Sequence, residues 1–127
     1  MIACAASTAA MSSASSTSAE ETQWVEYAEE ANGDLYFYDI SRIEKTGSVR
    51  RVWSGIRYKT PRMSAFSFMS LLEIDCSNRT EKTLQSTFFT DKNWERAAMK
   101  TDTTETENRQ IETESAIERL ANIVCDM

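Results

Sequence analysis

Two sets of side chains in this sequence have types and spacings that could carry chemistry: its cysteines and a cation–aromatic stripe. The cysteines are Cys4, Cys76 and Cys125, whose thiols can form a disulfide, act as nucleophiles or carry a lipid. Histidine is absent from the chain. Its absence removes Ser-His and Cys-His nucleophile pairs and the commonest zinc ligand. We therefore expect a protein that is not an enzyme.

The stripe lies on one face of the segment between residues 48 and 59. Its members are Arg50, Arg51, Trp53, Arg57 and Lys59. Arginine and tryptophan are enriched where protein interfaces are strongest, and a cation over an aromatic ring adds attraction. This pattern predicts partner binding through Arg51, Trp53, Arg57 and Lys59. The alternative is a solvated face whose charges pair across neighbouring strands.

Carboxylates gather at two further places. The first group surrounds an expected hairpin and consists of Glu29, Glu30, Asp34 and Asp39. Oxygen ligands suit a hard cation, but this spacing matches no known metal-binding loop. Glu73 and Asp75 lie two residues apart on the outward side of a strand, where no burial would shift their pKa values for acid–base work. We expect no metal, no cofactor and no catalytic residue.

Length and charge restrict the class of protein. The chain has 127 residues, enough for one domain, and a formal net charge of −6. An acidic chain does not suit a nucleic-acid partner, which requires clustered Lys and Arg. No run of about 18 apolar residues is present, so no segment is expected to span a membrane.

The first 22 residues differ in composition from the rest. Ala, Ser and Thr dominate them, and no charge precedes Glu20. Such a segment buries too little apolar surface to offset its ordering entropy, so we expect a disordered tether over 1–22 and a folded domain over 23–127. The start Met1-Ile2-Ala3-Cys4 is similar to the end of a bacterial lipoprotein signal, which predicts lipidation of Cys4. The charged and apolar regions that normally precede such a site are missing, so an unmodified flexible terminus is the alternative.

The remaining sequence predicts the elements that position these residues. Asn32-Gly33 is a tight-turn signal between two strands with alternating apolar residues. Further strands are expected over 48–59, 64–76 and 80–90, followed by a long exposed loop over 100–113. Ser115 to Glu118 forms a capping box that starts a helix. The expected fold is α+β: an antiparallel β-meander of four to five strands with a C-terminal helix packed on one face.

Two cysteines fall where this fold would bring them close. Cys76 belongs to the core-facing set of its strand, and Cys125 follows Val124 on the apolar stripe of the helix. A bridge between them would close a loop of about 50 residues and stabilise the domain by roughly 4 kcal/mol. Reduced, buried thiols are the alternative.

The chain resembles the bacterial surface-adhesin protein E-like family. The resemblance rests on Tyr38-Asp39 with Ser41 and Ile43, Val52-Trp53, Tyr58 with Pro61, Glu73-Ile74-Asp75-Cys76, Asn78-Arg79, Leu84-Gln85 and Cys125. It implies an exported, often lipid-anchored domain in which Cys76 and Cys125 are bonded. It also implies adhesion to host matrix and plasma proteins and a capacity to dimerise. Between Asn93 and Glu114 the chain departs from the family pattern.

The most consistent interpretation is a non-catalytic binding module of the bacterial cell envelope, in the periplasm or on the outer-membrane surface. It would bind a protein partner through an exposed sheet face or edge, form a homodimer by strand addition, and contact the membrane only through an N-terminal lipid. The alternatives are an intracellular regulatory domain with reduced thiols, and a small hydrolase that works without histidine.

Overall fold

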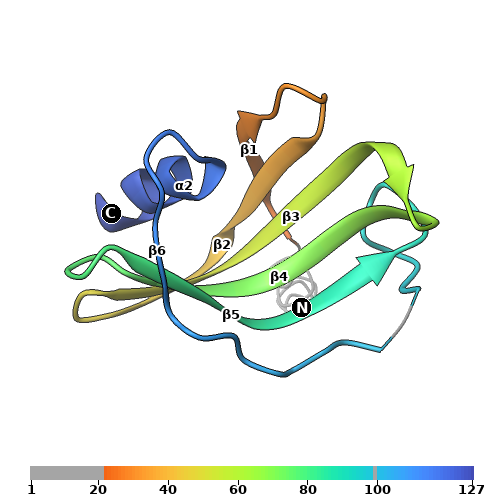
Figure 1. Cartoon of the computed structure of the whole chain (residues 1–127). Coiled ribbons are helices and arrows are strands. Elements are labelled where there is room, and N and C mark those ends of the chain that lie inside the picture. The colour runs from red at the N-terminus through yellow and green to blue at the C-terminus, as the bar shows by residue number, and fades with distance from the viewer. Residues whose placement is uncertain (1–21, 99) are drawn as a thin grey trace, which may run out of the picture.

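The computed structural model describes residues 22–98 and 100–127 and forms one antiparallel sheet with a helix against it (Figure 1). The sheet has six strands in the order of the sequence, so every strand pairs with its neighbour along the chain. The strands are β1 (Trp24–Glu29), β2 (Leu35–Thr46), β3 (Val49–Arg62), β4 (Ala65–Asp75), β5 (Thr80–Phe89) and β6 (Arg109–Gln110). The predicted meander is confirmed.

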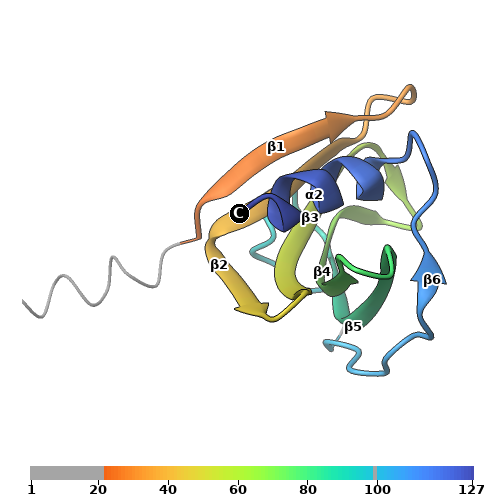
Figure 2. The ribbon, with the colours of Figure 1, turned by 90° about the vertical axis from the view of Figure 1, so that its left-hand side faces the viewer.

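The helix α2 (Ala116–Cys125) lies inside the curl of the sheet, between β1 and β6 (Figure 2). It begins where the capping box predicts. Glu118 N donates to the Ser115 hydroxyl at 3.2 Å, and the Glu118 carboxylate accepts from Glu114 N at 2.7 Å. The first bond satisfies an amide of the first turn that has no partner inside the helix, and the second ties the residue before the N-cap to that turn. The C-terminal helix on one face is confirmed.

The main core fills the space between α2 and the inner face of the sheet. Val52, Ile74, Leu120 and Val124 are fully buried there. Cross-strand register explains why they meet: Val52 pairs with Leu72, which places both side chains on the face that α2 covers. The i, i+4 spacing of Leu120 and Val124 turns both toward that face.

Two strands differ from what the sequence predicted. Strand β3 continues past Pro61 to Arg62, because the pairing register shifts between Arg57 and Arg62 and the ladder there needs no donor from the proline. Strand β6 lies inside the stretch expected to be a loop. Arg109 of β6 pairs with Glu81 of β5. This contact holds the stretch against the sheet, which its composition did not predict.

The two edges of the sheet are covered differently. Along β5, the outer edge is bonded by the chain that follows it, through Ala97 opposite Phe89 and Asp102 opposite Ser86. Strand β6 completes this cover. Strand β1 pairs with β2 alone among the described residues. The outer backbone groups of β1, a strand of six residues, are therefore without a strand partner in this part of the chain and could accept one.

Candidate partner-binding site

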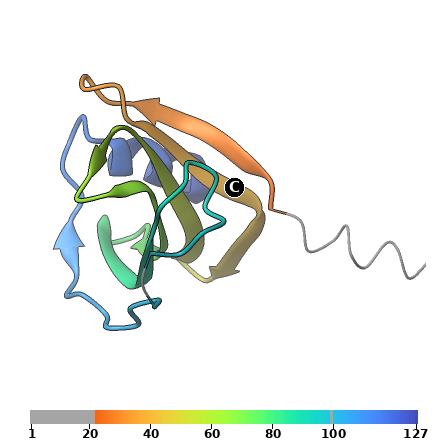
Figure 3. The same ribbon diagram turned by 90° about the vertical axis from the view of Figure 1, so that its right-hand side faces the viewer.

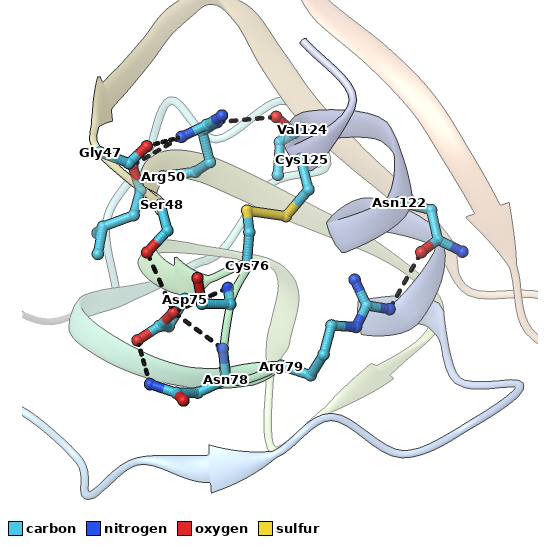
Figure 4. The surroundings of a disulfide bond; sticks show 12 residues. Gly47, Ser48, Arg50, Asp75, Cys76, Asn78, Arg79, Asn122, Val124 and Cys125 are labelled. Carbon is cyan, nitrogen blue, oxygen red and sulfur yellow. Dashed lines mark hydrogen bonds between the residues drawn. A yellow bond between two sulfur atoms is a disulfide. The ribbon is translucent and has the colours of Figure 1, made fainter.

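The disulfide between Cys76 and Cys125 fixes α2 to the end of β4 (Figure 4). The sulfur atoms are 2.03 Å apart and the two Cα atoms 5.8 Å apart. Two arginines add contacts at the same junction: Arg50 Nε donates to the Val124 carbonyl and Arg79 donates to the Asn122 side chain, each at 3.0 Å. Arg50 thus lies on the helix side of β3 and does not belong to the outer stripe.

The other four members of the stripe fall into separate environments on the outer face, the side away from α2. Arg51 and Trp53 line a hollow of about 380 Å³ together with Arg42 and Leu71. Arg51 pairs loosely with Glu73 at 3.4 Å and keeps about half of its side chain exposed (49 %). We call this space the Trp53 hollow.

Arg42 is held over the Trp53 ring by a buried carboxylate. Its guanidinium lies 5.2 Å from the centre of the indole and also binds Asp39, whose side chain has no exposed surface. Asp39 further accepts hydrogen bonds from Gln23 N and from the backbone and hydroxyl of Ser41. The register of β2 against β3 shifts between Tyr38 and Ile43, and the Asp39 carboxylate stabilises that irregularity.

These bonds also determine the ionisation of Asp39. Burial raises the pKa of a carboxyl group, but the hydrogen bonds from Ser41, Arg42 and Gln23 to the charged form outweigh it here. The pKa of Asp39 is therefore below its ordinary value of 3.8. Asp39 is ionised at neutral pH and holds the Arg42 cation in place.

The loop that follows β5 crosses the outer face (Figure 3) and binds the Arg57 side chain. Its guanidinium lies 5.0 Å from the Phe37 ring and 5.2 Å from the Trp94 ring. It also donates to the Lys92 carbonyl and the Asn93 side chain. Trp94 in turn stacks against Trp24 with ring centres 4.6 Å apart. We call the Trp24, Phe37, Arg57 and Trp94 group the Trp94 cluster.

Lys59 lies at the far end of β3, beside the first hairpin. Its backbone amide donates to Asp34 at 3.0 Å, and its side chain covers Gly33. Asp34 is almost completely buried and also binds Arg62 at 2.6 Å. Lys59 is therefore separated from the Arg51 and Trp53 pair by the residues of the Trp94 cluster.

Sequence reasoning missed Trp94 and Arg42 as members of this face. One signal for Trp94 was present: Gly55, in the middle of β3, has no side chain where the Trp94 ring lies. A glycine inside a strand marks a bend or a close approach by another group, and an isolated tryptophan in a polar stretch could supply that group. Arg42 gives no comparable signal, because its position depends on the shift in pairing register between Tyr38 and Ile43 of β2.

Two of the four carboxylates considered for a metal, Asp34 and Asp39, have other roles. Asp34 and Asp39 each accept several hydrogen bonds and face opposite ends of the first hairpin. Within residues 22–98 and 100–127, no three His, Cys, Asp or Glu side chains are grouped to hold an ion. In the same residues, no helix is both long enough and apolar enough to cross a membrane. Cys4 and nearly all of the predicted tether lie outside the described residues.

A curled antiparallel meander closed by one disulfide-bound helix defines a small α+β domain. The model of the surface-adhesin protein E family matches residues 24–126, so the chain belongs to that family of non-catalytic, exported cell-surface adhesins. The family expected from the sequence is confirmed.

Solved structures agree on the fold. Crystal form II of Haemophilus influenzae protein E superposes with a TM-score of 0.64 at 13% identity, covering 84% of this chain and 89% of that chain. Protein E from non-typeable Haemophilus influenzae gives a TM-score of 0.59 at 12% identity, covering 84% and 79%. No curated protein matches the sequence.

Proposed function

We propose that this chain is an envelope-located binding module that docks a protein partner through the open edge of β1 and the adjoining outer face. The observation that carries the proposal is the asymmetry of the two sheet edges. Strand β5 is covered by the chain that follows it, whereas β1 has unpaired backbone groups on its outer side in the described part of the chain. Such an edge can accept an extended segment of a host protein or of a second copy.

The outer face adds side-chain contacts to this backbone contact. Arg51 and Trp53 border the Trp53 hollow and keep exposed surface. Arg57 and Lys59 would contribute only at the margins, since Arg57 is bonded to the loop of Lys92 and Asn93. The Cys76–Cys125 disulfide supports an oxidising compartment, which agrees with the envelope and weighs against the alternative with reduced thiols.

The edge contact is tested by removing one outward donor. Gln23 O accepts from Ile40 N, so in an antiparallel ladder the amide of Glu26 points away from β2. Glu26→Pro should remove that donor and block strand addition without breaking a bond to β2. We expect binding to immobilised host matrix and plasma proteins to fall at least about tenfold. Glu26→Ala, which keeps the amide, is the matched control and should bind like the parent.

The face contact is tested by the double variant Arg51→Glu, Trp53→Ala. Binding to the same immobilised proteins should be lost, while circular dichroism shows an intact sheet. If a protein that binds the parent also binds both the edge variant and the double variant unchanged, the proposed docking surface is wrong. Sedimentation of the Glu26→Pro variant tests the homodimer, which should dissociate if two copies pair through β1.

A further inference from the structure

The unpaired edge of β1 carries acids on the outer face of the sheet. Glu26 pairs with Phe37, and Glu29 pairs with Leu35, whose partner on β3 is the outward-facing Arg57. Residues directly opposite each other on neighbouring strands share a face, so both glutamates lie on the outer side. Both residues are exposed. A segment added to this edge would therefore place every second side chain beside an acid.

These two carboxylates have no cation as a partner among the residues that the structure describes. Elsewhere on the outer face, acids are paired across the strands: Glu73 lies between Arg51 and Lys82 and binds both. Glu26 and Glu29 belong to the outermost strand, which has a neighbour on one side only. The other acids of the described ion pairs are Asp34, Asp39, Glu81 and Glu105. An added strand is thus the element that could bring cations to Glu26 and Glu29.

The inner side of the same edge is apolar. Val25 pairs with the core residue Tyr38 and so lies on the inner face, yet it is 38 % exposed. Tyr27 next along β1 is half-buried and packs against the main core. Helix α2 runs beside β1 on this side (Figure 2). Apolar side chains of an added strand would cover Val25 and remove apolar surface from water.

We propose that the β1 edge binds an extended protein segment in which Lys or Arg alternates with apolar residues. The cations would face Glu26 and Glu29, and the apolar side chains would cover Val25. Backbone bonds hold any added strand, whereas opposite charges across the two strands select among sequences. The inference rests on the proposed docking at β1 and names the chemistry of the segment that this edge accepts.

A second copy of the chain does not suit this edge. Two β1 strands paired about a two-fold axis would bring Glu26 and Glu29 of one copy next to the same residues of the other. Like charges directly opposite each other destabilise a pair of strands. Charged side chains on an edge strand are a common defence against such self-association. The edge is therefore selective for a different protein.

The experiment titrates the whole protein with capped synthetic peptides matched in length to β1. Valine alternates with lysine in the first peptide and with glutamate in the second, and a third has the residues of the first in two separate blocks. Amide shifts in NMR spectra give the affinity and show whether β1 is the site. At low salt the first peptide should bind at least about tenfold more tightly than either of the others.

Charge reversal tests which residues select. In the double variant Glu26→Lys, Glu29→Lys the preference should invert, so that the glutamate peptide binds more tightly than the lysine peptide. The matched control is Glu107→Lys, Glu112→Lys, which makes the same change in net charge at exposed positions on either side of β6. The control should keep the preference of the parent. Circular dichroism shows whether each variant retains the sheet.

Four results would overturn the proposal: the lysine and glutamate peptides bind alike, the blocked peptide binds as well as the alternating one, the reversed variant keeps the parent's preference, or the parent forms a dimer that Glu26→Pro dissociates. If Glu26→Pro abolishes binding of host proteins while charge reversal has no effect, the proposed function stands and the charge selectivity falls. If the lysine peptide is selected at β1 while host proteins bind Glu26→Pro like the parent, the selectivity stands and host docking at this edge falls.

Discussion

The indole of Trp94 lies directly against the backbone of Gly55, in the space that a side chain at that position would occupy. A Cβ built on Gly55 would come within 2.8 Å of the Trp94 ring. Trp94 itself has a positive φ of 58°, which is uncommon for a bulky residue. The glycine in β3 and the tryptophan in the loop therefore depend on each other, although 39 positions separate them (94 − 55).

Gly55→Ala should displace Trp94 from the outer face. We expect a loss of about 1–3 kcal/mol in the free energy of unfolding, because an added methyl overpacks the contact, together with a change in tryptophan fluorescence. Urea denaturation measures the loss. In a Trp94→Ala background the same glycine change should cost much less, and equal costs in the two backgrounds would show that the residues are not coupled.

Removing the disulfide should loosen α2. The bridge spans 49 positions, and the chain-entropy relation gives about 4 kcal/mol for a loop of this length. The double variant Cys76→Ser, Cys125→Ser should lose stability of that order in urea denaturation and show faster amide exchange in residues 116–125. Reductant should have a matching effect on the parent and none on the variant. A parent that melts identically with and without reductant would contradict this role.

Acid should destabilise the fold in part through Asp39. Its pKa is lower in the folded protein than its ordinary value of 3.8, so the folded state binds this proton less readily than the unfolded chain does. The stabilisation is complete above 3.8 and is lost as pH falls from there through the lower folded value. Asp39→Asn removes this dependence, so its unfolding free energy should change less steeply with pH over that window.

At neutral pH Asp39→Asn should also be less stable than the parent by about 1–3 kcal/mol, because bonds to a charged acceptor at a buried site are replaced by weaker ones. Asp102→Asn is a control for a carboxylate on the surface; its pKa is also lowered, by hydrogen bonds from Thr104, but it is exposed. Parallel stability profiles for Asp39→Asn and the parent across the acid range would rule out the role given to Asp39.

Arg109 should hold the acidic stretch against β5. Its guanidinium makes two bonds of 2.9 Å to Glu81, whose side chain is mostly buried. Arg109→Ala should therefore accelerate amide exchange at Thr106 and Ile111, which donate to Thr83 O and Arg79 O. Lys82→Ala, which removes the ion pairs with Glu105 and Glu73, should leave the Ile111 amide protected. Equal exchange in the two variants would refute the anchoring role.

Much of the fold follows from short-range patterns. Asn32-Gly33 predicts the first hairpin, and Ser115 with Glu118 predicts the helix start, because turn and cap chemistry act over a few residues. Alternation also separates Val52 from Arg51 and Trp53, since successive side chains of a strand face opposite sides. These features do not depend on what packs against the strand.

The candidate site is less predictable because it depends on distant segments. Alternation places Arg57 on the same face as Arg51, but cannot reveal that the backbone of Lys92 will cover it. Asp39 gives a similar case. In sequence it is one of several acids near a hairpin, and only the fold brings Gln23 and Arg42 to it as hydrogen-bond donors.

The order of the strands has a consequence for how the protein folds. Each strand pairs with the one before it, so β1 to β5 can assemble progressively through closure of short loops. The element that covers Val52, Leu72 and Ile74 is α2, which follows all six strands in the sequence. Until α2 docks and Cys125 bonds to Cys76, the apolar inner face of the sheet stays exposed to water and prone to associate with other unfolded chains. Docking of α2 thus protects the inner face of the sheet from aggregation.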